Sequence, residues 1–75
     1  MFTVITLNVN GIRSAARKGL FEWLALQDAD VVCLQEIRAQ LDELPKEFIN
    51  PEGYLGYFHC AEKKGYSGVA IYTRR

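Results

Sequence analysis

The sequence predicts an α/β fold in which a strand, a helix and a second strand are followed by a β-hairpin. Two short apolar runs, residues 2–9 and 31–36, are rich in β-branched side chains, and a segment with helical spacing separates them. A crossover of this length suits a parallel pair of strands. Two further strand-like runs, residues 54–61 and 69–74, flank the turn-like segment EKKGYSG, as expected for a hairpin.

The first strand is apolar on both faces, so we expect it to be central and covered on both sides. Ser14 is placed to cap the helix that follows, and this helix is expected to run to about Gln27. Gly19 weakens the first half of the helix, so its regular part can begin as late as that residue. The residues interpreted as core packing are Ala15, Ala16, Leu20, Trp23 and Leu24.

The run VVCLQE, residues 31–36, predicts a second buried strand because it is β-branched, apolar and too short for a helix. Residues 37–53 predict a loop with a short helix around Leu41 to Phe48, followed by the turn NPEG. His59 lies in the third predicted strand and receives no functional role.

The composition is that of an ordinary globular protein and excludes several classes. Nine basic residues balance nine acidic ones, so no overall field favours nucleic acid or a membrane. No apolar run approaches the roughly 20 residues that span a bilayer, and no basic segment typical of a signal peptide precedes the first strand. Cys33 and Cys60 lie in apolar runs, and we interpret both as buried free thiols of a reducing compartment. We therefore expect a soluble, cytoplasmic protein.

The last predicted strand has no capping element after it. With 75 residues the chain is also short for a self-sufficient hydrophobic core. We therefore expect residues 1–75 to be the N-terminal piece of a longer protein.

Polar side chains end both strands of the predicted parallel pair. Asn8 ends the first strand and Glu36 ends the second. Because the carboxyl ends of parallel strands lie at the same edge of a sheet, we expect these two side chains to converge. A carboxylate beside an amide oxygen suits Mg²⁺ or Mn²⁺ better than zinc. Taken alone, each residue has a simpler interpretation, Glu36 as a solvated strand end or helix cap and Asn8 as a turn former.

Three motifs in this order, TLNVNGIRSA, VVCLQEIRA and GYSGVAIYTRR, resemble the first motifs of the exonuclease III family of abasic-site endonucleases. This family lies within the endonuclease/exonuclease/phosphatase superfamily, and the resemblance runs from Phe2 to Arg75. It implies a four-layer α/β/β/α sandwich with two mixed β-sheets and helices outside. Residues 1–75 would form the N-terminal fragment of this single domain.

The resemblance also implies an activity, which is Mg²⁺-dependent hydrolysis of the DNA phosphodiester on the 5′ side of an abasic site. Exonuclease activity in the 3′-to-5′ direction and 3′-phosphatase activity often accompany it. The implied partner is double-stranded DNA with abasic sites or 3′ ends, bound by a monomer. Two alternatives stay open: a superfamily phosphatase or phosphodiesterase acting on a non-DNA phosphoester, and a non-catalytic fragment.

On this resemblance Glu36 corresponds to the metal-binding glutamate, and Asn8 corresponds to the asparagine that helps bind the ion or orients catalytic groups. Asn10 falls where family members carry Asp or Asn, so it is a candidate metal ligand with less charge than Asp. The activating base and its partners are expected in motifs beyond residue 75, because no G-D-x-N, S-D-H or Y-x-P-N motif occurs here. The chain alone is therefore expected to be inactive.

The residues expected to contact DNA are Arg13, Arg38, Tyr66, Ser67 and Lys64, of which Arg13, Tyr66 and Ser67 match positions of the family. A guanidinium near a metal site binds phosphate well, although Arg13 can also be a solvated loop charge. Arg38 departs from the usual Q-E-x-K pattern, and arginine keeps the positive charge of lysine but changes its reach and geometry. Tyr66 and Ser67 can equally form a plain hairpin turn, and Lys64 can simply face solvent, as can its neighbour Lys63.

Overall fold

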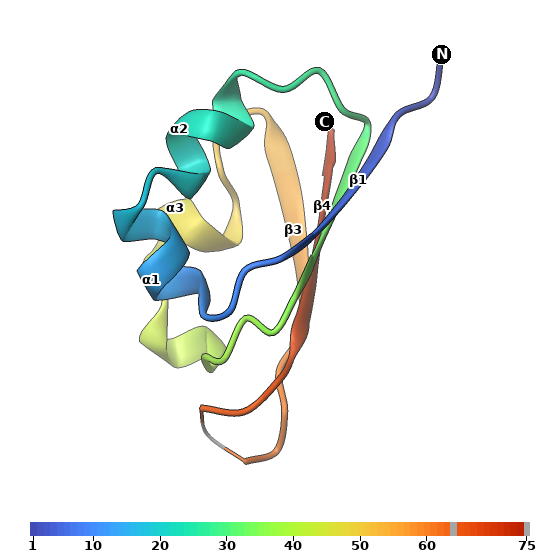
Figure 1. The fold of residues 1–75 in the computed structure, drawn as a ribbon. Coiled ribbons are helices and arrows are strands. Elements are labelled where there is room, and N and C mark those ends of the chain that lie inside the picture. The colour runs from blue at the N-terminus through green and yellow to red at the C-terminus, as the bar shows by residue number, and fades with distance from the viewer. Residues whose placement is uncertain (64, 75) are drawn as a thin grey trace.

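The computed structural model describes residues 1–63 and 65–74 as one mixed four-stranded sheet with helices on one face (Figure 1). The strands are β1 (Val4–Asn8), β2 (Val31–Gln35), β3 (Tyr54–His59) and β4 (Val69–Arg74), in the order β1-β2-β4-β3. β1 and β2 are parallel, whereas β4 is antiparallel to both β2 and β3. The helices are α1 (Ile12–Arg17), α2 (Leu20–Ala25), the 3₁₀ turn η1 (Leu41–Glu43) and α3 (Lys46–Ile49). The predicted α/β class is confirmed.

The single helix expected between the first two strands is in fact two short helices. α1 begins at Ile12 after Gly11, so Ser14 lies inside the helix and does not cap it. The chain then turns at Gly19, whose φ of 101° is in the left-handed region, before α2 begins. Glycine adopts this conformation without steric cost, and a helix cannot continue through it. The regular part of the predicted helix therefore begins only after Gly19, as the sequence allowed, and it ends at Ala25 rather than at about Gln27.

The short helix predicted around Leu41 to Phe48 is likewise divided, because Pro45 separates η1 from α3 with an extended ψ of 155°. The third strand ends at His59, two residues earlier than expected.

No helix in residues 1–63 and 65–74 combines the length and apolar character needed to cross a bilayer. Cys33 and Cys60 are free and half-buried.

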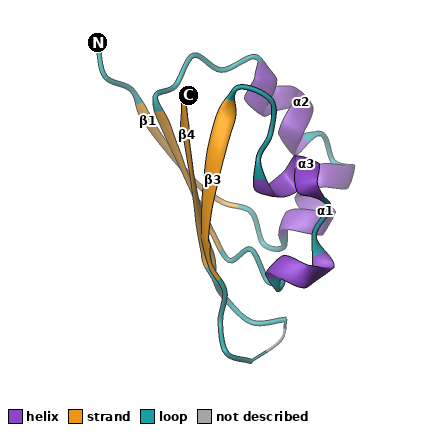
Figure 2. Cartoon of the chain, turned by 180° about the vertical axis from the view of Figure 1, so that it is seen from behind, coloured by secondary structure: helices purple, strands orange, loops and turns teal. Residues whose placement is uncertain are grey.

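The core lies between the sheet and its helices, as Figure 2 shows from behind. The largest of its fully buried side chains are Tyr72, Ile12, Leu24, Leu34, Ile37 and Val32. The Tyr72 hydroxyl donates a hydrogen bond to the Phe48 carbonyl, and burial raises the pKa of this tyrosine. Leu20 and Leu24 are core residues as predicted, but Trp23 is 38% exposed.

Within residues 1–63 and 65–74, no helix covers the opposite face of the sheet (Figures 1 and 2), and apolar side chains on this face are exposed. Tyr57 is 60% exposed, Val4 is 50% exposed and Val69 is 45% exposed. β1 is also an edge strand of this sheet, so the expectation that it is central and covered on both sides was wrong for the described residues. Apolar residues on both faces indicate that both faces are suited to burial, but not which elements cover them. An uncovered apolar sheet face matches one inner surface of a sandwich.

Candidate active site

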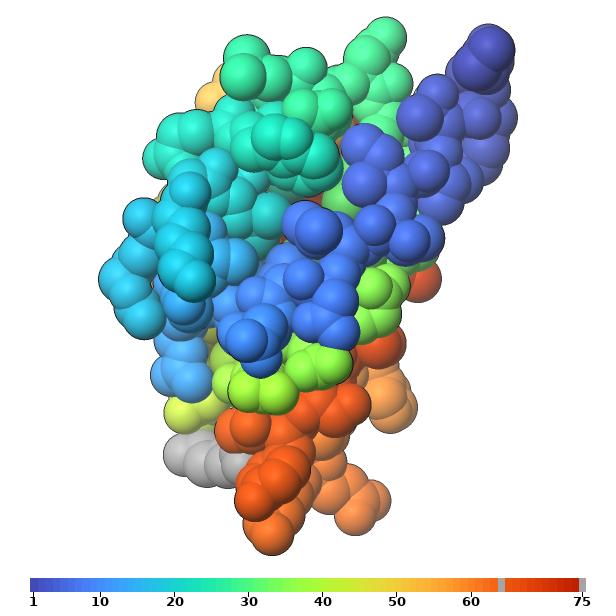
Figure 3. Space-filling model, viewed as in Figure 1, coloured from blue at the N-terminus to red at the C-terminus, as the bar shows by residue number. Residues whose placement is uncertain are grey.

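Three loops meet at the edge of the sheet where β1 and β2 end and β4 begins. The Gly11 amide donates to the Glu36 carbonyl at 2.8 Å, and the Ile12 amide donates to the Ile37 carbonyl at 2.9 Å. The Arg38 amide in turn donates to the Ser67 carbonyl at 2.8 Å. Figure 3 shows the segments near residues 10, 37 and 66 adjoining on one surface. Backbone hydrogen bonds therefore hold the three sequence motifs together.

Unusual backbone conformations gather in the same three loops. Within residues 1–63 and 65–74, four non-glycine residues have a positive φ: Asn10 (46°), Glu36 (55°), Arg38 (53°) and Ser67 (42°). The left-handed region costs an L-residue roughly 1–2 kcal/mol, and such conformations cluster at functional sites. All four are residues to which the sequence assigned a site role.

Glu36 and Asn8 lie in direct contact, as their positions at the ends of parallel strands predicted. The Asn8 side-chain nitrogen Nδ2 donates to Glu36 Oε2 at 2.6 Å. The Asn8 oxygen Oδ1 accepts the Asn10 backbone amide at 3.0 Å. The amide of Asn8 is therefore oriented from both ends, with its donor toward the carboxylate and its oxygen toward the loop.

The second carboxylate oxygen of Glu36 has a cationic partner. Arg38 Nη2 donates to Glu36 Oε1 at 2.9 Å. The hydrogen bond from Asn8 lowers the pKa of the Glu36 carboxyl below 4.5, desolvation opposes this, and the hydrogen bond and charge of Arg38 add to the lowering. Glu36 is consequently an anion throughout the neutral pH range.

The donors at this edge fit part of a Mg²⁺ site. Mg²⁺ prefers oxygen ligands and usually takes only one or two carboxylates, with water and substrate phosphate completing its shell. Glu36 supplies such a carboxylate, and the exposed residue Asn10 lies two positions after Asn8, in the loop that follows β1. Within residues 1–63 and 65–74 no group of three or more His, Cys, Asp or Glu residues could hold a metal. These residues therefore fit one side of the ion.

Arginine side chains surround a polar cavity of about 410 Å³ next to Glu36. It is lined by Gly11, Arg13, Ser14, Arg17, Arg38 and Gly65. Arg13 also donates to the Arg38 carbonyl at 3.3 Å and lies 4.0 Å from Glu43. Sequence reasoning missed Arg17, although its i, i+4 spacing from Arg13 places both on one face of α1. A cavity lined by three arginine side chains is suited to binding phosphate.

The turn before β4 projects from the same edge. Tyr66 is 57% exposed, and the Lys63 ammonium lies 4.5 Å from its ring centroid in a cation–π contact. The Ser67 carbonyl accepts the Arg38 amide, which ties the turn to the Glu36 loop. Lys64, the remaining residue predicted to contact DNA, lies outside the described residues.

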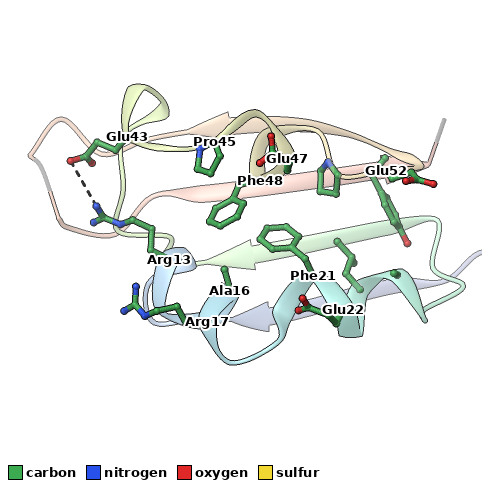
Figure 4. A pocket seen from close by; sticks show the side chains of 14 residues that line it. Arg13, Ala16, Arg17, Phe21, Glu22, Glu43, Pro45, Glu47, Phe48 and Glu52 are labelled. Carbon is green, nitrogen blue, oxygen red and sulfur yellow. Dashed lines mark ion pairs between the residues drawn. The ribbon is translucent and has the colours of Figure 1, made fainter.

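A larger cavity of about 690 Å³ lies between α2 and α3, away from Glu36 (Figure 4). Its floor is apolar, with the rings of Phe21 and Phe48 4.7 Å apart between centroids. Figure 4 places Arg13 and Arg17 at one end of it and marks the pair between Arg13 and Glu43. The lining of this cavity includes neither Asn8 nor Glu36.

These features place the chain in the α/β class of proteins. Its mixed sheet has one helical layer, and oxygen donors, including a carboxylate, lie where the two parallel strands end. Comparison with known proteins then identifies the family: residues 5–75 match the Endonuclease/Exonuclease/phosphatase family, and the chain belongs to it.

The chain is similar to several nucleases. It is 41% identical over 73 residues to the exodeoxyribonuclease of Bacillus subtilis (strain 168), covering 96% of this chain and 28% of that protein. It is 43% identical over 72 residues to the DNA-(apurinic or apyrimidinic site) endonuclease 2 of Xenopus laevis, covering 95% of this chain and 14% of that protein. An AP endonuclease structure from Archaeoglobus fulgidus superposes with a TM-score of 0.82 at 33% identity, covering 97% of this chain and 27% of that one. The chain thus spans less than a third of each of these proteins.

Proposed function

We propose that residues 1–75 form the N-terminal part of a single endonuclease/exonuclease/phosphatase domain in a DNA-repair nuclease. The proposed reaction is Mg²⁺-dependent hydrolysis of the phosphodiester 5′ to an abasic site, with 3′-to-5′ exonuclease and 3′-phosphatase activities on 3′ ends. The observation that carries this proposal is the Glu36 carboxylate, oriented by Asn8 at 2.6 Å beside an arginine-lined cavity. The relatives named above, an exodeoxyribonuclease and an abasic-site endonuclease, support DNA as the substrate.

The proposed roles follow from the contacts. Mg²⁺, when bound, supplies neutralisation of charge on the scissile phosphate and on the leaving oxygen. Glu36 would hold the ion, with Mn²⁺ as a possible substitute, and Asn10 is a further candidate ligand. Asn8 orients Glu36, because its amide donates to the carboxylate and its oxygen is held by the Asn10 amide. The base that activates water is expected outside this chain.

The DNA side of the proposal uses the arginine cavity and the exposed turn. Arg13 lines a cavity that it shares with Arg17 and Arg38, and charge-assisted contacts from arginine to phosphate position a duplex without reading its sequence. Tyr66 and Ser67 lie on a turn tied to the Glu36 loop, so a duplex held by them would lie against the candidate metal site. We propose duplex DNA as the partner, an intracellular location and a monomeric complete protein.

The test is incision of a duplex oligonucleotide that carries one abasic site, by the protein translated from the complete reading frame. Mg²⁺-dependent cleavage immediately 5′ to the lesion, abolished by excess EDTA, is the expected result. Glu36→Gln should nearly abolish cleavage while circular dichroism stays unchanged, because the amide cannot supply an anionic ligand. The matched control is Glu52→Gln, an exposed glutamate far along the chain, which should leave cleavage unchanged. A folded protein that leaves the duplex intact but hydrolyses another phosphoester would move the substrate to a different branch of the superfamily.

A further inference from the structure

Both carboxylate oxygens of Glu36 are engaged by protein donors. Asn8 holds Oε2, and Arg38 Nη2 donates to Oε1 at 2.9 Å. The contact arises from the backbone: Arg38 has a φ of 53°, and its amide is anchored on the Ser67 carbonyl. This conformation brings its side chain back onto a residue only two positions earlier. Arg38 thus already places a positive charge on the oxygen that a metal ion would need.

A guanidinium and a divalent cation compete for the same oxygen. Two cations cannot both approach Oε1 closely, because their mutual repulsion opposes it. The Arg38 and Glu36 side chains are 47% and 39% exposed, and ion pairs this open to solvent are weak enough to exchange. Arg38 also lines the cavity that Arg13 and Arg17 line. Its guanidinium can therefore rotate away from Glu36 and toward this cavity.

We infer that Arg38 is a positioning residue that occupies Glu36 Oε1 until a divalent cation arrives, and is then displaced toward the arginine-lined cavity. Before displacement it holds the carboxylate in place beside Asn8. After displacement its guanidinium faces the cavity and adds one phosphate contact. Cation binding and phosphate binding then favour each other, as linkage between two sites requires. The phosphate half of this inference rests on the proposed function, whereas the competition at Glu36 does not.

The competition is tested by Mn²⁺ affinity, measured from the EPR signal of free Mn²⁺ on the complete protein without DNA. Arg38→Gln removes the competing charge and should tighten Mn²⁺ binding about 2–5-fold, the range expected for losing an exposed ion pair. Arg38→Lys keeps the positive charge but lacks the planar guanidinium, so its Mn²⁺ affinity should lie between those of the wild type and Arg38→Gln. Arg17→Gln is the matched control, since it removes a charge from the same cavity without touching Glu36. Equal or weaker Mn²⁺ binding by a folded Arg38→Gln, or an equal gain in Arg17→Gln, would overturn the inference.

The displacement is tested by the salt dependence of duplex binding, followed by fluorescence anisotropy with Ca²⁺ and without a divalent cation. Each phosphate contact contributes about 0.9 to the slope of log K against log salt. In the wild type, Ca²⁺ should steepen the slope by about that amount, because one guanidinium is released to the DNA. In Arg38→Gln, Ca²⁺ should leave the slope unchanged. In Arg17→Gln, Ca²⁺ should still steepen the slope by about the same amount, although the slope itself is smaller than in the wild type. An unchanged wild-type slope would refute displacement.

The two arms separate this inference from the proposed function. Tighter Mn²⁺ binding by Arg38→Gln in a protein that does not incise DNA would support the competition and refute the nuclease assignment. Incision of abasic DNA with identical Mn²⁺ affinities would support the assignment and refute the competition.

Discussion

Gly68→Ala should damage both stability and the candidate site, because Gly68 supports the residue that follows Glu36. Gly68 is buried with a φ of 91°, and an added Cβ would lie 2.9 Å from Ile37 Cγ1. Ile37 is fully buried, so it cannot move away without displacing its neighbours. The left-handed backbone costs alanine about 1–2 kcal/mol, and overpacking of a core costs about 1–3 kcal/mol more. The free energy of unfolding should therefore fall by about 2–5 kcal/mol.

Gly53→Ala separates the two contributions. Gly53 has a φ of 87°, but nothing lies within 4 Å of an added Cβ. This variant should lose only the backbone part, about 1–2 kcal/mol. Urea unfolding of the complete protein, with the slope m held constant, measures both changes. Gly68→Ala should also lose abasic-site incision because displacement of Ile37 moves Glu36, whereas Gly53→Ala should keep it. Equal losses of stability and activity in the two variants would refute the reasoning.

Three further changes follow from single contacts. Gly56→Ala should destabilise by more than about 3 kcal/mol in urea unfolding, because its Cβ would lie 1.8 Å from the Ile49 carbonyl oxygen. Tyr72→Phe should cost about 1 kcal/mol by the same measurement, since the part-buried Phe48 carbonyl loses its donor. The folded-state pKa of Glu36 is lowered from 4.5, so its ionised contacts stabilise the fold above that pH and are lost as the pH falls through the lowered pKa. The stability difference between wild type and Glu36→Gln should therefore be constant at neutral pH and shrink below 4.5; a difference that shrinks already near neutral pH would contradict the lowered pKa.

Residue types and their spacing were sufficient to predict the strands, the parallel pairing of β1 with β2 and the convergence of Asn8 with Glu36. Each depends on local information: β-branched runs, a crossover of helical length, and the rule that parallel strands end at one edge. The sandwich architecture was predicted from the family motifs, whose order and spacing can be read from the sequence alone. The division of the helix at Gly19 was foreseen only in part, since glycine signals weakness without saying which conformation it will take.

Contacts between segments distant in the sequence set which sheet faces are covered and where the charged side chains point. The pattern of β1 is apolar on both faces, yet the helices cover only one, because the path of the chain after β1 sets where they pack. The side-chain amide of Asn8 points its nitrogen at Glu36 because its oxygen accepts a hydrogen bond from the backbone amide of Asn10. Arg38 returns to Glu36 because a positive φ, held by the Ser67 carbonyl, reverses the direction of its side chain. Such contacts depend on backbone angles imposed by distant segments, which residue type and spacing do not encode.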